Sequence, residues 1–133
     1  MYKNYNDYLA NKKTLSMEEM QEIHQEILNE IQGDEEAEVL YEELLSVGNK
    51  YAALRTGWTL LSREEKMEKD FGRTSCHNSL ITHFNMLARY MRQQGKNTKW
   101  REELGYEEED RYNRKKIGDF ACYLAFVNGI NSR

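Results

Sequence analysis

Ile117-Gly118-Asp119-Phe120-Ala121-Cys122-Tyr123-Leu124-Ala125-Phe126-Val127 is the most apolar stretch of this chain of 133 residues. In a helix, these residues place hydrophobic side chains on almost every face, and a helix of that kind is surrounded by neighbours. The uninterrupted apolar run at 120–127 is much shorter than the roughly 20 residues that a membrane-spanning helix needs. The stretch therefore predicts a central helix at about 108–128 and no membrane partner.

Glycines mark where helices are expected to end elsewhere in the chain. A glycine readily takes the left-handed backbone conformation that commonly follows the last turn of a helix. Six of the eight glycines close a helical pattern in this way: Gly33, Gly57, Gly72, Gly95, Gly105 and Gly129. We expect a helix to end at each of them.

Capping residues mark where the helices begin. Ser16 and Ser62 are each followed three positions later by a glutamate, which is the pattern of a capping box. Asp34 and Ser75 can cap the helices that follow them. Together with apolar residues at steps of three and four, these residues predict helices at about 16–32, 35–56, 63–71, 76–94 and 98–104.

The pattern contains no useful length of alternating apolar and polar residues, so no β-strand is expected. The first two helices should form an antiparallel hairpin that turns at Gly33-Asp34, and the helix at 76–94 should be deeply buried. We predict an all-α fold, with residues 1–133 forming one compact bundle of five to six helices around the hydrophobic C-terminal helix. Residues 1–15, with tyrosines at helical spacing, are expected to dock as a short helix or to fray.

Length and composition narrow the class of protein. The chain is one domain long, which excludes a two-domain enzyme, and its 39% of hydrophobic residues suffice for a core. No apolar segment of the secretory kind begins the sequence, so we expect a cytoplasmic protein. The absence of proline and the eleven asparagines favour a bacterial source. We expect Cys76 and Cys122 to be reduced, buried thiols.

Charge is divided unevenly along the chain. Residues 1–50 carry 4 Lys or Arg and 12 Asp or Glu, whereas residues 51–133 carry 15 and 11. Either the acidic half folds back on the basic half, or one of the two faces stays open to a partner of opposite charge.

A polar cluster, Arg73-Thr74-Ser75-Cys76-His77-Asn78, lies at the predicted start of the helix at 76–94. Unpaired backbone amides and the helix dipole make such an end attractive to anions. The cluster is either an ordinary cap, with Ser75 or Thr74 bonding the backbone, or a site where Arg73 holds a phosphate- or carboxylate-bearing ligand. No glycine-rich phosphate loop supports the second interpretation.

Asp119 interrupts the most apolar stretch, where an unpaired carboxylate is costly. The carboxylate is either exposed and paired with Lys115 or Lys116, or part of a buried network with a cation from another helix, or an active-site acid or base. We predict that the following residues lie close together as a ligand-binding group: Arg73, His77, Asn78 and Asp119.

No arrangement of catalytic or metal-binding residues stands out. His77 and His83 are six residues apart, which places them about 120° apart on a helix, too far round to hold one metal ion. The chain has no HExxH, CxxC or EF-hand pattern. We therefore predict no catalytic residue, no metal and no cofactor, and expect a binding protein rather than an enzyme.

A basic stretch in the last helix offers an alternative function, nucleic-acid binding. It consists of Arg111, Arg114, Lys115 and Lys116. Its neighbours at 107–110 are four consecutive acidic residues, which would repel a phosphate backbone. Acidic residues before basic ones on a helix also fit its dipole without any ligand. The net charge of −4 argues further against a nucleic-acid partner.

Residues 73–78 (RTSCHN) and 116–121 (KIGDFA) resemble a group of small bacterial helical proteins, a domain-of-unknown-function family. The resemblance covers roughly the last 65 residues and implies an all-helical bacterial protein, without transferring a catalytic residue. The function we expect is that of a protein-interaction or regulatory module, which binds another protein or a second copy as a homodimer. The alternatives are nucleic-acid binding through 111–116, and a small-ligand or metal site, or an enzyme, near Arg73, His77 and Asp119.

Overall fold

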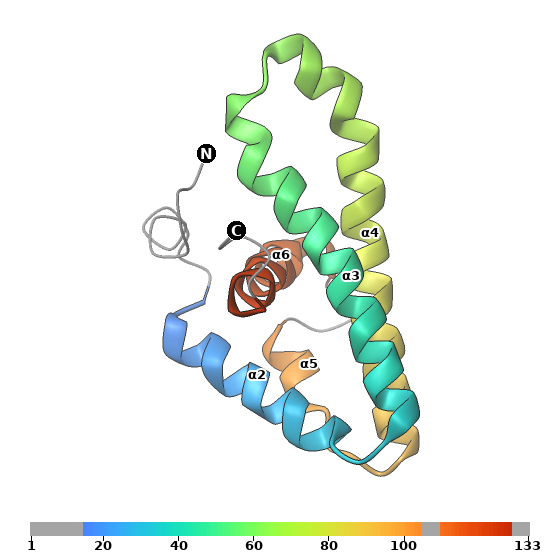
Figure 1. The fold of residues 1–133 in the computed structure, drawn as a ribbon. Helices are drawn as coiled ribbons and strands as arrows, with labels where there is room; N and C mark the ends of the chain where they lie inside the picture. The colour runs from blue at the N-terminus through green and yellow to red at the C-terminus, as the bar shows by residue number, and fades with distance from the viewer. Residues whose placement is uncertain (1–14, 105–109, 129–133) are drawn as a thin grey trace.

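The computed structural model describes residues 15–104 and 110–128, and this part of the chain is helical without a strand, which confirms the all-α prediction (Figure 1). The elements follow in the order α2 (Met17–Ile31), α3 (Glu35–Gly57), the short 3-10 helix η1 (Trp58–Leu60), α4 (Arg63–Gln93), α5 (Lys99–Glu103) and α6 (Asp110–Val127). The expectations for residues 1–14, Gly105 and Gly129 lie outside the described residues. Among the described helices, none has the length and apolar character needed to cross a membrane.

The predicted capping residues begin three of the helices. The Ser16 hydroxyl accepts a hydrogen bond from the Glu19 amide at 3.0 Å, and the Glu19 carboxylate accepts one from the Ser16 amide at 3.1 Å. Ser62 repeats this capping box at the start of α4. Asp34 accepts a bond from the backbone amide three residues later and so caps α3. These bonds satisfy amides that have no partner within the helix, and they confirm the predicted starts.

The predicted break at Gly72 is wrong. Helix α4 runs without interruption through this glycine for 31 residues, so Ser75 begins no helix. A glycine inside a helix costs only about 1 kcal/mol relative to alanine, which a long helix packed against a neighbour readily tolerates. Gly33 and Gly95 do end helices, with positive φ angles of 83° and 80°. Helix α3 ends at Gly57, also as predicted, so of the glycines predicted to end helices in the described ranges only Gly72 lies inside one.

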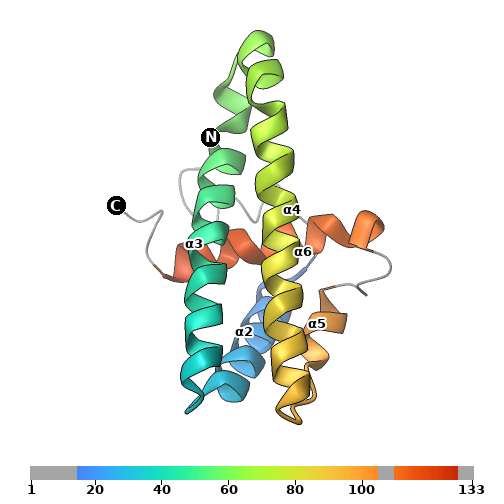
Figure 2. The ribbon, with the colours of Figure 1, turned by 90° about the vertical axis from the view of Figure 1, so that its right-hand side faces the viewer.

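The closely packed antiparallel helices are α3 and α4, which lie side by side in both views (Figures 1 and 2). They are called the α3/α4 pair below. The expected hairpin between α2 and α3 turns at Gly33 as predicted, but the two helices then diverge into a V (Figure 1). The segment 63–71, expected to be a separate short helix, is the first part of α4 and pairs with the end of α3.

Helix α6 runs across the α3/α4 pair and explains why α2 diverges (Figure 2). Its residues 117–125 are all buried. The Phe120 ring contacts Phe84 of α4 at 6.0 Å between centroids, and the Tyr123 ring contacts His24 of α2 at 5.8 Å. Because α6 contacts α2 on one side and α4 on another, it fills the space that a closed α2/α3 hairpin would need.

The α3/α4 pair extends well beyond the level at which α6 crosses it (Figures 1 and 2). The projecting end, residues 57–73, consists of the last residue of α3, the 3-10 turn η1 and the first turns of α4. It is called the hairpin tip below. The fold therefore has two unlike regions on one pair of helices: a crossing covered by α6 and a tip that projects from the body.

Candidate functional site

Asp119 is the best-defined polar residue of the core. Its side chain is 2% exposed, and its Oδ1 atom accepts a hydrogen bond from Nη2 of Arg55, on α3, at 2.5 Å. Two charges withdrawn from water are tolerated only in such close pairs. Of the three interpretations of Asp119, the structure shows the buried pair with a cation from another helix, and that cation is Arg55.

Gly118 allows α6 to approach this ion pair. A Cβ atom at Gly118 would lie 2.7 Å from Nη1 of Arg55 and 2.7 Å from the hydroxyl oxygen of Tyr51, which is closer than real Cβ contacts. Arg55 also donates from Nη1 to that Tyr51 hydroxyl at 3.5 Å. An alanine beside Asp119 would therefore force the ends of the Arg55 and Tyr51 side chains to move. Burial raises the pKa of Tyr51, so its hydroxyl stays protonated at neutral pH.

The four predicted ligand-binding residues are only partly brought together. The His77 ring lies 5.1 Å from the Tyr51 ring, and Asp119 acts electrostatically on the same tyrosine. The Arg73 guanidinium lies over the Trp58 ring at 4.6 Å, and the Asn78 side chain is exposed. Since residues 73–78 lie inside α4, their amides are not the free donors of a helix start, and the predicted start at residue 76 is wrong. Ligand binding by the four residues stays a prediction.

The two cysteines lie on different helices, Cys76 on α4 and Cys122 on α6. Cys122 is buried and Cys76 is half-buried, and neither forms a disulfide. Burial raises the pKa of the Cys76 thiol, which disfavours the reactive thiolate. Within the ranges 15–104 and 110–128, no three His, Cys, Asp or Glu residues are placed to hold a metal ion together.

The basic stretch at 111–116 stays a prediction. Its residues belong to α6, but the side chains of Arg111, Arg114 and Lys115 lie outside the described part of the structure, as do Glu107, Glu108 and Glu109. The Lys116 side chain is half-buried.

A carboxyl pair joins α2 to α5. Ionised carboxylates can only accept hydrogen bonds, and with both groups ionised Oε2 of Glu26 and Oε1 of Glu103 are buried without a donor among the described groups. Burial, followed by the hydrogen bond and the charge of Glu103, raises the pKa of Glu26 to about 7; Glu30 raises it further and Lys99 lowers it. Two interacting carboxyl groups can share one proton, which gives both buried oxygens a partner and agrees with the raised pKa of Glu26.

The hairpin tip carries the most exposed large apolar side chains of the described chain. Leu60 is 66% exposed, Met67 is 72% exposed and Phe71 is 84% exposed. Beside them a surface hollow is lined by Trp58, Arg63, Lys66, Met67 and Asp70. Exposed apolar side chains with polar neighbours, on one projecting end of a molecule, are typical of a surface that another molecule covers.

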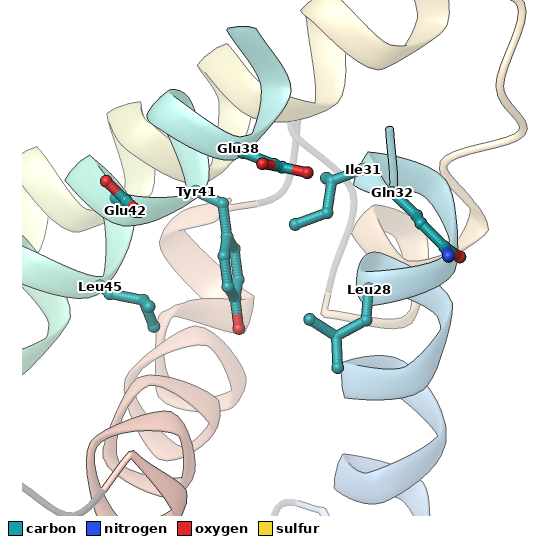
Figure 3. Close-up of a pocket in the computed structure, with 7 residues that line it drawn as sticks. All are labelled: Leu28, Ile31, Gln32, Glu38, Tyr41, Glu42 and Leu45. Carbon is teal, nitrogen blue, oxygen red and sulfur yellow. The ribbon is translucent and has the colours of Figure 1, made fainter. Parts of the chain in front are cut away.

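A second surface feature is a groove between α2 and α3, near the vertex of the V (Figure 3). Leu28, Ile31, Tyr41 and Leu45 point into it from both helices, whereas Gln32, Glu38 and Glu42 lie around its edge (Figure 3). The Tyr41 hydroxyl and Nε2 of His24 lie 3.2 Å apart, which fixes the tyrosine that forms the floor. Burial raises the pKa of Tyr41 to about 12.

Sequence reasoning missed Arg55 and the hairpin tip. Arg55 follows Tyr51 by one helical turn, on the apolar stripe of α3. A single cation on a buried helix face indicates that an acidic residue of another element is buried beside it. Met67 and Phe71 are four residues apart and share one face of α4, but the break predicted at Gly72 concealed the length of that helix.

Comparisons with models of protein families, with curated proteins and with solved structures found no match. The resemblance to a small bacterial helical family therefore stays a prediction.

Proposed function

We propose that this protein is a protein-interaction module and that the hairpin tip contacts its partner. The observation that carries the proposal is the exposure of Leu60, Met67 and Phe71, at 66%, 72% and 84%, on one projecting end of the molecule. Burying an apolar side chain is worth about 25 cal/mol per Å² of surface removed from water. Three such residues together therefore supply a strong reason for another surface to cover the tip.

The partner that this tip favours is a protein rather than a nucleic acid. The residues that line the hollow beside the apolar side chains include both Arg63 and Lys66 and the acidic Asp70. The tip as a whole, residues 57–73, carries four basic and four acidic residues, so it has no net charge to attract a phosphate backbone. Apolar side chains with a mixed polar rim are the usual composition of a protein interface.

The proposal includes the setting in which the module acts. We place it in the cytoplasm of a bacterium, with its helices forming a compact bundle and α6 at the centre. The burial of residues 117–125, together with the contacts of α6 to both α2 and α4, supports that arrangement. Regulation by binding, rather than turnover of a substrate, is the activity that fits a folded body with one projecting apolar end.

Site-specific photo-crosslinking tests the proposal. A photoreactive phenylalanine analogue replaces Phe71 in cells of the source organism, and the matched control carries it at Val39, an apolar position on α3 that is 52% exposed. We expect a discrete protein adduct from position 71 and none from position 39. An adduct of twice the chain's mass would identify the partner as a second copy. The absence of any adduct at 71, or the same adducts at both positions, would overturn the proposal.

A further inference from the structure

We propose that the groove between α2 and α3 is a docking site for a basic amphipathic helix of a partner protein. This surface is separate from the hairpin tip and does not depend on the function proposed for it. The groove measures about 380 Å³ and lies between two helices that diverge from the turn at Gly33. Figure 3 shows side chains of both helices directed into it.

The floor of the groove is apolar. Ile31 and Tyr41 are buried at its base, Leu45 is half-buried, and Leu28 is 37% exposed at the side of α2. These residues lie on two helices, so the groove accepts side chains that project from one face of a third helix. An amphipathic helix offers such a face, with apolar residues at positions i, i+3, i+4 and i+7.

Acidic residues at the edge of the groove favour a basic partner. On the α3 side the edge consists of Glu38 and Glu42, and on the α2 side it consists of the neutral Gln32. Residues 17–50, which form α2 and the first part of α3, contain 11 acidic residues and a single basic one, Lys50. A helix with lysine or arginine beside its apolar face therefore finds complementary charge along one side of the groove.

Charge also argues against a second copy of this chain binding through the same groove. In a two-fold dimer the same patch of each subunit faces the other, so Glu38 and Glu42 would meet their own copies. Like charges placed opposite each other weaken an interface. A basic segment from a different protein avoids this repulsion and gains from the same carboxylates.

A fluorescent 14-residue peptide of leucine and lysine, patterned as an amphipathic helix, serves as the probe. Its binding to the full chain is followed by fluorescence anisotropy. The control peptide has the same composition in an order that breaks the apolar face. We expect the patterned peptide to bind with micromolar affinity and the control peptide to bind at least about tenfold more weakly, because a helix-in-groove site recognises the face as well as the charge.

Two matched pairs of variants locate the binding. The double variant Glu38→Gln/Glu42→Gln should weaken the patterned peptide about fivefold, as expected for two surface charges, while Glu36→Gln/Glu43→Gln, at exposed positions of the same helix outside the groove, should not. Leu28→Ser should weaken it by a similar factor, and Val39→Ser should leave it unchanged.

Three results would overturn the docking site. These are equal binding of the two peptides, equal losses in both charge pairs, and an unchanged affinity in Leu28→Ser. The tip variant Phe71→Ser should bind the peptide as the wild type does, because the tip is a separate surface. Failure of the docking-site proposal would therefore leave the hairpin tip proposal unaffected.

Discussion

The crossing and the hairpin tip use the same two helices in opposite ways. Where α6 crosses, a charged residue of α3, Arg55, is only 8% exposed and is paired with Asp119. At the tip, an aromatic residue of α4, Phe71, is 84% exposed. At these two positions of the α3/α4 pair, the charged residue is buried and the aromatic residue is exposed, the reverse of what polarity alone predicts.

The buried ion pair at the crossing and the exposed apolar side chains at the tip have different consequences for the protein. A buried ion pair is held by the fold around it, and removing one partner leaves a charge without water or a counter-ion. The exposed apolar side chains of the tip have no such internal partner. They are removed from water only when a second surface covers them. The crossing is thus expected to control stability, and the tip is expected to control binding.

The largest effect on stability is expected from Asp119→Ala. The change leaves the Arg55 guanidinium buried beside Tyr51 without its carboxylate, and broken buried pairs typically cost about 3–5 kcal/mol. Urea denaturation followed by circular dichroism measures the free energy of unfolding. A loss below about 1 kcal/mol would mean that the crossing is not the closely packed region described here.

The double variant Arg55→Met/Asp119→Leu is the control for that experiment. It removes both charges and keeps apolar volume at the crossing, so it should recover most of the stability lost in Asp119→Ala. A double variant as unstable as the single one would show that the loss came from packing rather than from the unpaired charge.

Gly118→Ala should destabilise the crossing by about 1–3 kcal/mol, the usual range for overpacking a filled core. The new Cβ atom would meet the Arg55 guanidinium and the Tyr51 hydroxyl at 2.7 Å, so both side chains or the helix itself must move. The same denaturation experiment measures the effect. An unchanged midpoint would contradict the close approach of α6 to α3.

The α2/α5 contact adds a pH dependence near neutral pH. The pKa of Glu26 is about 7 in the folded protein against a usual value of 4.5, so protonation favours the folded state. This stabilisation is complete below about pH 4.5 and is lost as pH rises through about 7. We expect it to contribute about 1 kcal/mol, because solvent screens a carboxyl group that is partly exposed.

Unfolding free energies compared at several values of pH between 5 and 8 measure this contribution. Glu26→Gln should remove the part of the pH dependence of the unfolding free energy that comes from Glu26. Glu22→Gln, at an exposed glutamate on the same helix, should keep that pH dependence. A wild type and a Glu26→Gln variant with the same pH profile would contradict the shared proton.

The smallest effect is a gain, expected from Gly72→Ala at the tip. No atom lies within 4 Å of a Cβ placed there, and the residue is inside a helix, where alanine is favoured by about 0.5–1 kcal/mol. A rise in the urea midpoint would confirm that α4 is continuous. A loss of stability would restore the helix end that the sequence pattern predicted at this glycine. Gly118→Ala is its matched contrast.

The sequence predicted those features that depend on local chemistry. The capping boxes at Ser16 and Ser62 and the burial of residues 117–125 follow from neighbouring residues, and the structure contains them. The break at Gly72 was predicted from local preference alone, and packing of α4 along α3 prevailed over a cost of about 1 kcal/mol. A local sequence pattern does not reveal the stabilisation that comes from packing against residues distant in the sequence.

The candidate sites depended on contacts that are distant in sequence. Asp119 was recognised as unusual, but its partner Arg55 is 64 residues away, and spacing could not select it among the other cations. The exposure of Phe71 depends on where α6 ends its cover of the α3/α4 pair, which no stretch of sequence states. The buried polar residue was therefore predictable as an anomaly, and the projecting apolar surface was not.

Oxidation of methionines tests the contrast between core and tip most directly. Met67 is 72% exposed at the tip, Met86 is 41% exposed elsewhere on α4, and Met91 is fully buried. With dilute peroxide and mass spectrometry on the purified protein, we predict fast oxidation of Met67, slower oxidation of Met86 and almost none of Met91. Inside cells, Met67 alone should become protected. Equal oxidation of Met67 in cells and in the purified protein would contradict the account.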